Sequence, residues 1–443
     1  MTRLFPPTRL RFLPLVLAIG WGAGAQAQSL LDLYQSARGY DSTYQSAKAQ
    51  FDATLAKADQ AKSLLLPKAS MDLSSSRTNY ESAATATDRV FGTQSATLSA
   101  SQPLFRPVDW ATYAQGIKGA ETASSALKAA EQDLIVRLSQ AYFDVLASSD
   151  SLQFVQAQKT AVQEQLASAK RNFEVGTATI TDTREAQARY DLVLAQEIAA
   201  DSDLRVKNLA LTQLVGGNEV KPKSVSAPVV LSSVSPDDVN FWVSQSQMEN
   251  QGLLQLQVAF EVAKLETKKA QAGHLPTLDL VGKYIATDNN GSAANPANIG
   301  SNTTTIGLAL NLPLFAGFST QNRIRETVAL EAKARTDLEG SQRSVAQATR
   351  AAFYGVQSGL GQVKALEAAE VSSQSALDAN KLGYQVGVRI NIDVLNSQSQ
   401  LFDTKAKLAK ARYDVLVGGL KLRQASGSLK VEDLEQVNAL LAK

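Results

Sequence analysis

The sequence predicts a mainly α-helical fold with a small β part, in which one structural unit occurs twice. Three observations lead to this fold class. Proline is absent from two very long stretches, several short motifs recur at a constant spacing, and a few segments alternate apolar and polar residues. Each unit is expected to contain a helix, a β-hairpin and a long helical hairpin.

The N-terminus has the three parts of a secretory signal peptide, namely a basic start, a short apolar run and a small-x-small cleavage site. These parts are Arg3, Arg9 and Arg11, then residues 12–22, then Ala25-Gln26-Ala27. The apolar run of about 11 residues is too short to span a bilayer as a helix, which needs about 20. We therefore expect residues 1–27 to be removed on export, which lowers the formal charge from +2 to about −1.

The composition excludes several classes of function. The chain has no cysteine, and His274 is its one histidine. Disulfides, a lipid-modified N-terminal cysteine, thiolate metal sites and multi-histidine metal sites are therefore excluded. The near-neutral charge does not suggest a nucleic-acid partner. The sequence also has no Ser/His/Asp arrangement, metal-ligand cluster or phosphate loop, so we expect neither an enzyme nor a cofactor.

Long stretches without proline indicate long helices, because proline costs about 3 kcal/mol inside a helix. One stretch begins after Pro107 and the other after Pro313, and their apolar residues recur at the three- and four-residue spacing of a coiled coil. From Pro107 to Gly176, an unbroken helix of about 70 residues would measure about 100 Å. The shorter proline-free segments 28–66 and 237–275 are also expected to be helical.

Matching motifs place the two copies of the unit about 210 residues apart. The matched pairs are Leu66-Pro67 with Leu275-Pro276, Pro103-Leu104-Phe105 with Pro313-Leu314-Phe315, Ala141-Tyr142-Phe143 with Ala352-Phe353-Tyr354, and Val175-Gly176 with Val386-Gly387. The boundaries that follow are 28–216 for the first repeat, 217–239 for a linker and 240–443 for the second repeat. The β-hairpins are expected at about 66–105 and 276–315, and the helical tips near Gly176 and Gly387.

Period-2 alternation predicts the strands. In the segment Thr305–Phe315, leucine and isoleucine alternate with small or polar residues, as in a strand with one apolar and one polar face. A similar pattern follows Pro276, and a weaker one follows Pro67. The segments Ser74–Ser95 and Thr287–Thr304 are polar and low in complexity, so we expect them to connect the strands of each hairpin.

Four strands are too few to close a barrel within one chain. In a bilayer every backbone polar group must be paired, and the smallest single-chain barrels have eight strands. Three copies would supply twelve, so a cyclic homotrimer with a shared 12-stranded transmembrane β-barrel is the simplest closed arrangement. A soluble α+β protein with two surface hairpins stays open at this point, since soluble sheets also alternate.

Four segments, taken together with their order and duplication, carry a resemblance to a known family. They are Val175-Gly176 through Ile180-Thr181-Asp182, Gly273-His274-Leu275-Pro276-Thr277-Leu278-Asp279-Leu280, Gly383-Tyr384-Gln385-Val386-Gly387 through Ile392-Asp393-Val394-Leu395, and Ala411-Arg412-Tyr413. On these segments the chain resembles the TolC family of outer-membrane efflux and secretion channels.

The resemblance implies a homotrimer in the outer membrane, with a 12-stranded barrel on an α-helical tunnel that crosses the periplasm. It implies an equatorial region around the tunnel, formed by 217–239 and the C-terminal segment. It also implies three kinds of partner: outer-membrane lipid, a periplasmic adaptor (membrane fusion protein), and an inner-membrane ABC transporter or proton-driven pump.

The function implied by the resemblance is a gated exit duct of a tripartite export system. The missing lipid-anchor cysteine and the two-segment gate favour type I protein secretion. Small-molecule or multidrug efflux stays open as an alternative. A periplasmic adaptor, which also uses long helical hairpins, is a further alternative of a different class.

The resemblance also assigns roles at the hairpin tips. It places the network that holds the gate closed at Thr181, Asp182, Tyr384 and Arg389, whose side chains suit hydrogen bonds between neighbouring hairpins. It places the contacts with the adaptor on the two tips. The tip residues are Val175, Gly176, Thr177, Val386, Gly387 and Val388.

The aperture of the gate corresponds to Asp393 and Asn396, which lie one helical turn apart on one face. Family members commonly carry an acidic residue at both positions. Asn396 replaces the second acidic ring with neutral amides. We therefore expect weaker block by divalent cations and lower cation selectivity than in a relative with two aspartates.

Overall fold

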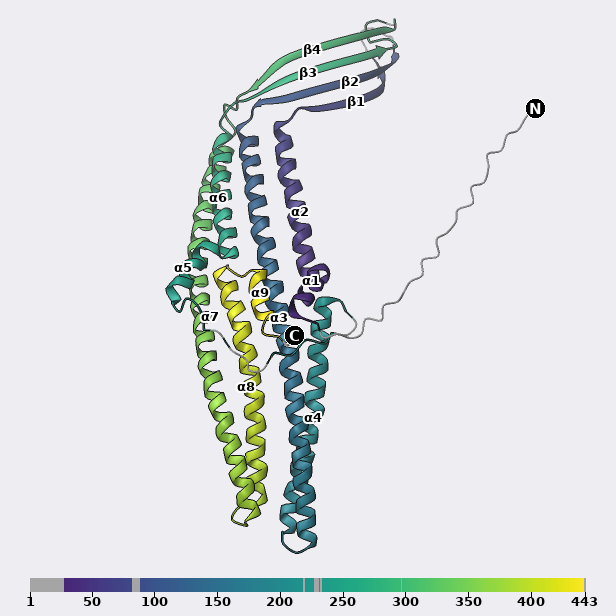
Figure 1. Ribbon diagram of the computed structural model, residues 1–443. Helices are drawn as coiled ribbons and strands as arrows, with labels where there is room; N and C mark the ends of the chain where they lie inside the picture. The colour runs from purple at the N-terminus through teal and green to yellow at the C-terminus, as the bar shows by residue number, and fades with distance from the viewer. Residues whose placement is uncertain are drawn as a thin grey trace, which may run out of the picture.

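The computed structural model describes residues 28–81, 88–217, 220–226, 231, 233–295 and 297–441. The expected signal peptide, residues 1–27, lies outside these ranges. The molecule is elongated, with a sheet at one end and two helical hairpin tips at the other (Figure 1). Helix, β-hairpin and long helical hairpin follow one another twice along the chain, which confirms the predicted mainly helical, duplicated fold.

Each repeat opens with two consecutive helices that a single capping residue separates. The first pair is α1 (Leu30–Tyr40) and α2 (Ser42–Lys62), and the second is α5 (Val239–Glu249) and α6 (Gln251–Ala272). Asp41 and Asn250 stand between the helices of each pair with a non-helical ψ of 118° and 120°. Their side-chain oxygens accept from the backbone N–H of Tyr44 at 2.8 Å and of Leu253 at 3.1 Å. The expected helical segments are therefore each interrupted at an N-cap.

Asp41 also joins these short helices to the long helix beside them. Arg137 donates to both of its carboxylate oxygens, at 3.0 and 3.1 Å, and Asp41 is only 6% exposed. The Arg137 guanidinium holds the pKa of the Asp41 carboxyl below its usual range. Asp133, one turn from Arg137, provides a second and more exposed partner for the same guanidinium.

The two longest helices run from the sheet to the hairpin tips. They are α3 (Pro107–Glu174) with 68 residues and α7 (Ser319–Gln385) with 67. At 1.5 Å per residue each is about 100 Å long. Proline at the first position of α3 is compatible with a helix start because its missing N–H would have no intrahelical partner. The helices α4 (Ile180–Val215) and α8 (Asn391–Ser426) return from the tips.

The helices lie side by side in one curved layer. Near the sheet the order is α2, α3, α6 and α7, and toward the tips it is α4, α3, α8 and α7 (Figure 1). Between these halves, the short helix α9 (Val431–Asn438) and residues 220–226 pack at mid-height. Residues 220–226 reach both ends of the described chain, through a bridge from Gln28 to Pro222 and one from Val225 to Leu441.

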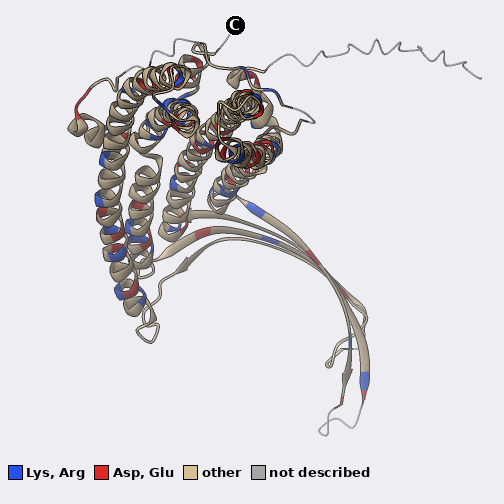
Figure 2. Cartoon of the chain, turned by 90° about the horizontal axis from the view of Figure 1, so that it is seen from below, with Lys and Arg blue, Asp and Glu red and all other residues tan. Residues whose placement is uncertain are grey.

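The sheet has four antiparallel strands in the order β1-β2-β3-β4. They are β1 (Lys68–Tyr80), β2 (Arg89–Phe105), β3 (Thr277–Asn289) and β4 (Ile299–Asn311). The sheet is strongly curved (Figure 2). The outer edges of β1 and β4 pair with no other described strand.

Two expectations about the strands were wrong in detail. Most of the segment Ser74–Ser95 was expected to be a connection, yet β1 continues to Tyr80 and β2 begins at Arg89. The end of β1 is polar on both faces, since Ser74, Ser76 and Thr78 alternate with Ser75, Arg77 and Asn79, so it lacks the alternation of a strand with one apolar face. The strand expected over Thr305–Phe315 instead covers Ile299–Asn311, since Pro313 has no N–H to donate to a ladder.

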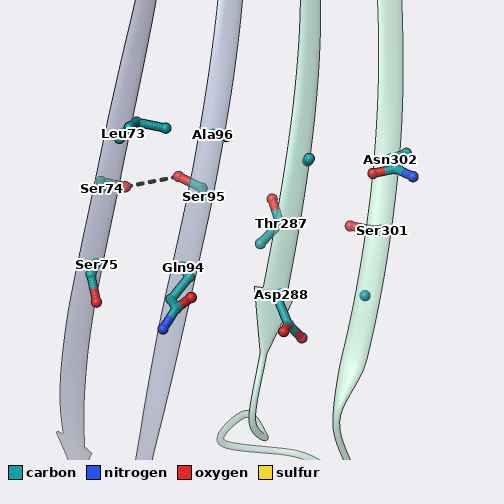
Figure 3. Close-up of a pocket in the computed structure, with 12 residues that line it drawn as sticks. Leu73, Ser74, Ser75, Gln94, Ser95, Ala96, Thr287, Asp288, Ser301 and Asn302 are labelled. Atoms are coloured by element: carbon teal, nitrogen blue, oxygen red, sulfur yellow. Dashed lines mark hydrogen bonds between the residues drawn. The ribbon is translucent and has the colours of Figure 1, made fainter. Parts of the chain in front are cut away.

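The register of the strands separates polar from apolar residues. Ser74, Ser95, Thr287 and Ser301 form one cross-strand row, and the first two hydroxyls hydrogen-bond at 2.7 Å. This row lies in a hollow lined by all four strands (Figure 3). The residues on the opposite face of the sheet, which alternate with these along each strand, are largely apolar. They include Met71, Leu98, Leu278, Leu280, Tyr284, Ile306, Leu308 and Leu310.

Candidate gate and membrane-facing sheet

The two hairpin tips have the same backbone construction. Gly176 and Gly387 follow α3 and α7 with φ of +81° and +78°, a conformation that other residues adopt at a cost. In each tip the N–H of the glycine donates to the carbonyl three residues earlier. The residues expected to contact an adaptor all lie in these turns, and Val175, Val386 and Val388 are largely exposed.

Asp182 stabilises its own helix end within the subunit. Its carboxylate accepts from the backbone N–H and the hydroxyl of Thr179 at 2.9 and 2.8 Å, and the Thr179 hydroxyl accepts from the Asp182 N–H at 3.2 Å. This is a capping box that begins α4. Thr181, the next expected gate residue, is exposed at the start of the same helix.

The other two expected gate residues lie on the second hairpin. The Tyr384 hydroxyl accepts a long hydrogen bond of 3.5 Å from the Asn172 amide of α3. Arg389 forms an ion pair of 3.7 Å with Asp393, one turn further on. Among the described residues, the structure therefore brings neither Tyr384 to Asp182 nor Arg389 to Thr181 within one subunit.

The expected aperture positions differ in their surroundings. Asp393 is partly exposed and has Arg389 as its ion-pair partner. Asn396 is exposed, and its amide oxygen accepts from the guanidinium of Arg189 on α4 at 2.6 Å. The sequence-based assignment missed Arg189. Its position seven residues after Asp182, on the same helix face, is the signal that could have found it.

A seam of contacts joins the two hairpins within the subunit. Leu395 of α8 is fully buried in a cluster whose other buried members come from α3 and α4. Those members are Val162, Leu166, Ala169, Ala186 and Val193. Gln158 of α3 also donates to the hydroxyl of Ser399 on α8 at 3.1 Å. The packing of Leu395 thus fixes the height of Asp393 and Asn396 relative to α4.

The apolar face of the sheet is exposed although its residues are large. Ile306, Leu308 and Leu310 of β4 are 77%, 66% and 69% exposed. Burying such side chains gains about 1.5–3 kcal/mol each, so a continuous apolar face of this kind needs an apolar environment. Aromatic residues gather where the strands meet the helices, as at a membrane interface. They are Phe105, Trp110, Phe315 and Phe318.

Throughout the described ranges, the helices lack any stretch that is both long and apolar enough to cross a membrane. Within the same ranges, three or more potential metal ligands do not gather at any point.

The subunit has a long helical body with hairpin tips at one end and a curved sheet with an exposed apolar face at the other. These features are typical of a subunit of a membrane channel. The chain belongs to the outer membrane efflux protein family, whose family model matches twice, over residues 33–217 and 242–428. Each match covers most of one repeat.

Individual relatives match over nearly the whole chain. Outer membrane protein TolC of Vibrio cholerae is 33% identical over 97% of this chain and 98% of its own length. Alkaline protease secretion protein AprF of Pseudomonas aeruginosa is 30% identical over 94% of this chain and 88% of its own. The crystal structure of VceC from Vibrio cholerae has the same fold, with a TM-score of 0.76 at 18% identity over 90% of this chain and 96% of that one.

These findings confirm the expected class of function. The protein is a non-enzymatic outer-membrane exit duct, with a periplasmic tunnel, for type I secretion or efflux. The roles of individual residues at the tips stay predictions.

Proposed function

We propose that three copies of this chain form one closed duct, with a 12-stranded barrel on a common helical tunnel. The observation that carries the proposal is the position of the open edges. β1 follows α2 on one side of the subunit, and β4 precedes α7 on the other. A head-to-tail ring would pair β1 of one copy with β4 of the next, and would leave no strand edge in lipid.

The exposed apolar residues of α4 support the same ring. Leu194, Ile198, Val206 and Leu209 recur at three- or four-residue multiples on this helix and are 39–70% exposed in the single subunit. The helix lies at the α2 side of the layer, opposite α7. In the proposed ring this stripe packs against α7 of the neighbouring copy, as a coiled-coil seam.

The gate is proposed to close between subunits. Thr181 and Arg389 are exposed, and the hydroxyl of Tyr384 has only a long bond to Asn172. These groups therefore have free hydrogen-bonding capacity toward a neighbour. Each such bond contributes about 1 kcal/mol, and more when one partner is charged. Threefold repetition would give a gate that partners can still open.

The tips of the two hairpins are proposed to receive a periplasmic adaptor, which links the duct to an inner-membrane transporter. The valines of the tips are apolar and exposed and would lie at the periplasmic end of the tunnel. For the cargo, type I protein secretion with an ABC transporter is favoured. A relative at 30% identity, AprF, is named as an alkaline protease secretion protein.

A deletion strain tests the proposed cargo. We expect loss of a secreted protein from the medium, with restoration by the wild-type gene and little change in antibiotic susceptibility. The second candidate, small-molecule efflux with a proton-driven pump, is supported by the family's description as efflux proteins. Normal secretion together with several-fold higher drug susceptibility would favour that candidate and contradict secretion.

A further inference from the structure

We propose that Arg189 sets the charge of the narrowest ring of the duct and makes it permissive for anionic solutes. The inference rests on the proposed trimeric duct and on the aperture position of Asn396. It concerns a residue of α4 that the expected gate does not include.

The charge of Arg189 is held at the aperture and is not neutralised there. Its guanidinium donates to the amide oxygen of Asn396 at 2.6 Å, and an amide carries no net charge. Arg189 forms no ion pair with any residue that the structure describes. Arg205, on the same helix, is instead paired with Asp201 at 2.8 Å.

In the described part of the chain, the other charged groups nearby form no ion pair with this guanidinium. Asp393 is paired with Arg389, so this pair is neutral as a unit. Asp191 accepts from the neutral amide of Gln187 and, two residues after Arg189, lies about 200° around α4 from it. Arg184 and Glu185 are adjacent in sequence and opposite in sign. Among the described residues, Arg189 is therefore the charged group that directly contacts Asn396.

Packing keeps Arg189 in this position. Ala186 and Val193, three residues before it and four after it, are fully buried against Leu395. Leu395 is the direct neighbour of Asn396. The same buried contact therefore aligns the Arg189 side chain of α4 with the aperture turn of α8.

Threefold symmetry would place three such guanidinium groups around the axis. Rings of arginine or lysine favour anions in pores, as rings of aspartate or glutamate favour cations. Asn396 thus does more than remove an acidic ring. Together with Arg189 it replaces that ring by a cationic one.

Planar-bilayer recordings across a KCl gradient test the proposal. Arg189→Gln is expected to raise the permeability ratio of K⁺ to Cl⁻ about threefold, because the ring loses its charge. Arg205→Gln, the same substitution on the same helix away from the aperture, serves as the control and should keep the wild-type ratio. An Arg189→Gln channel with the wild-type ratio would overturn the proposal.

Block by Mg²⁺ gives a second readout. In Asn396→Asp, the introduced carboxylate would pair with Arg189, so block should stay close to that of the wild type. The double variant Arg189→Gln/Asn396→Asp leaves the carboxylate free, and Mg²⁺ should block it at about tenfold lower concentration. Equally strong block of Asn396→Asp and the double variant would contradict the proposal.

Asp393→Asn separates this inference from the proposed function. If the tips form the aperture, this substitution changes K⁺ conductance whether or not Arg189 matters. A response to Asp393→Asn without a response to Arg189→Gln would refute the role of Arg189 alone. No response to either variant would refute the placement of the aperture itself.

Discussion

Asp41 and Asn250 occupy matching places in the two repeats and end a helix in the same way. In each case the side-chain oxygen caps the N-terminus of the next helix. Asp41 adds a second interaction, since both of its carboxylate oxygens accept from Arg137. A single side chain thus decides where α1 ends and ties it to α3.

Asp41→Ala removes the cap and leaves Arg137 with its more exposed partner. We expect a loss of about 2 kcal/mol of stability, because a cap contributes about 1 kcal/mol and a buried charge pair contributes more when one partner is removed. Thermal unfolding of the detergent-solubilised protein at neutral pH measures the loss. Asp133→Ala, which removes the exposed partner of the same arginine, should cost clearly less.

The difference between Asp41→Ala and the wild type should depend on pH. The pKa of Asp41 is lowered in the folded protein by Arg137. Its contribution is therefore complete above the unfolded pKa, which is about 4, and is lost as pH falls through the lower folded value. The melting difference should shrink below about pH 4. A difference that grows in acid would contradict this assignment.

At the scale of elements, the hairpins are held together by the seam at Leu395. This residue is fully buried between α8 and the pair α3 and α4. Leu395→Ala is expected to cost about 2–4 kcal/mol locally and to loosen the gate. Bilayer recordings should show a larger mean conductance or more frequent openings.

Leu382→Ala is the matched control for the seam, because Leu382 is 61% exposed near the same tip. It should keep the closed-state conductance of the wild type. Equal conductance of the two variants would show that burial of Leu395 does not hold the gate.

The two faces of β4 allow a paired test of membrane contact. Leu308→Lys places a charge on the apolar face, where a barrel residue at the bilayer midplane pays about 2–4 kcal/mol. Thr305→Lys places the same charge on the polar face of the same strand. We expect much less Leu308→Lys protein in the outer-membrane fraction and near-normal amounts of Thr305→Lys. Equal amounts would argue that the apolar face does not meet lipid.

Some of these elements could be predicted accurately from the sequence and others could not, for physical reasons. Proline spacing predicted α3 and α7 because proline strongly disfavours a helix interior. The alternation in β4 showed its apolar face, whereas the serine-rich β1 lacked a strong period and its end was misplaced. The breaks at Asp41 and Asn250 depend on hydrogen bonds that a helical period does not reveal.

The candidate site was less predictable than the fold. The glycines of both tips were identified because the repeat shows them twice. Arg189 was not identified, because its importance depends on a contact with Asn396, which lies 207 positions away in the sequence. The gate network was inferred from a resemblance, and its bonds would form between subunits.

At the scale of the whole molecule, the sheet and the helical layer both leave unpaired surfaces on the same two sides of the subunit. The sheet has open edges at β1 and β4, and the helical layer ends at α2 and α4 on one side and at α7 on the other. One head-to-tail ring satisfies all of these surfaces at once. We therefore expect β1 of one copy to pair with β4 of the next.

Cysteine cross-linking tests this pairing of β1 with β4 without interference, because the chain has no cysteine of its own. Ser74→Cys in β1 is combined, one at a time, with cysteine at Ser301, Thr303 or Thr305 on the same face of β4. Mild oxidation of outer membranes should give a reducible ladder that ends at a covalent trimer for at least one pair. The absence of cross-links for every pair, or a ladder that continues beyond three copies, would contradict the shared barrel.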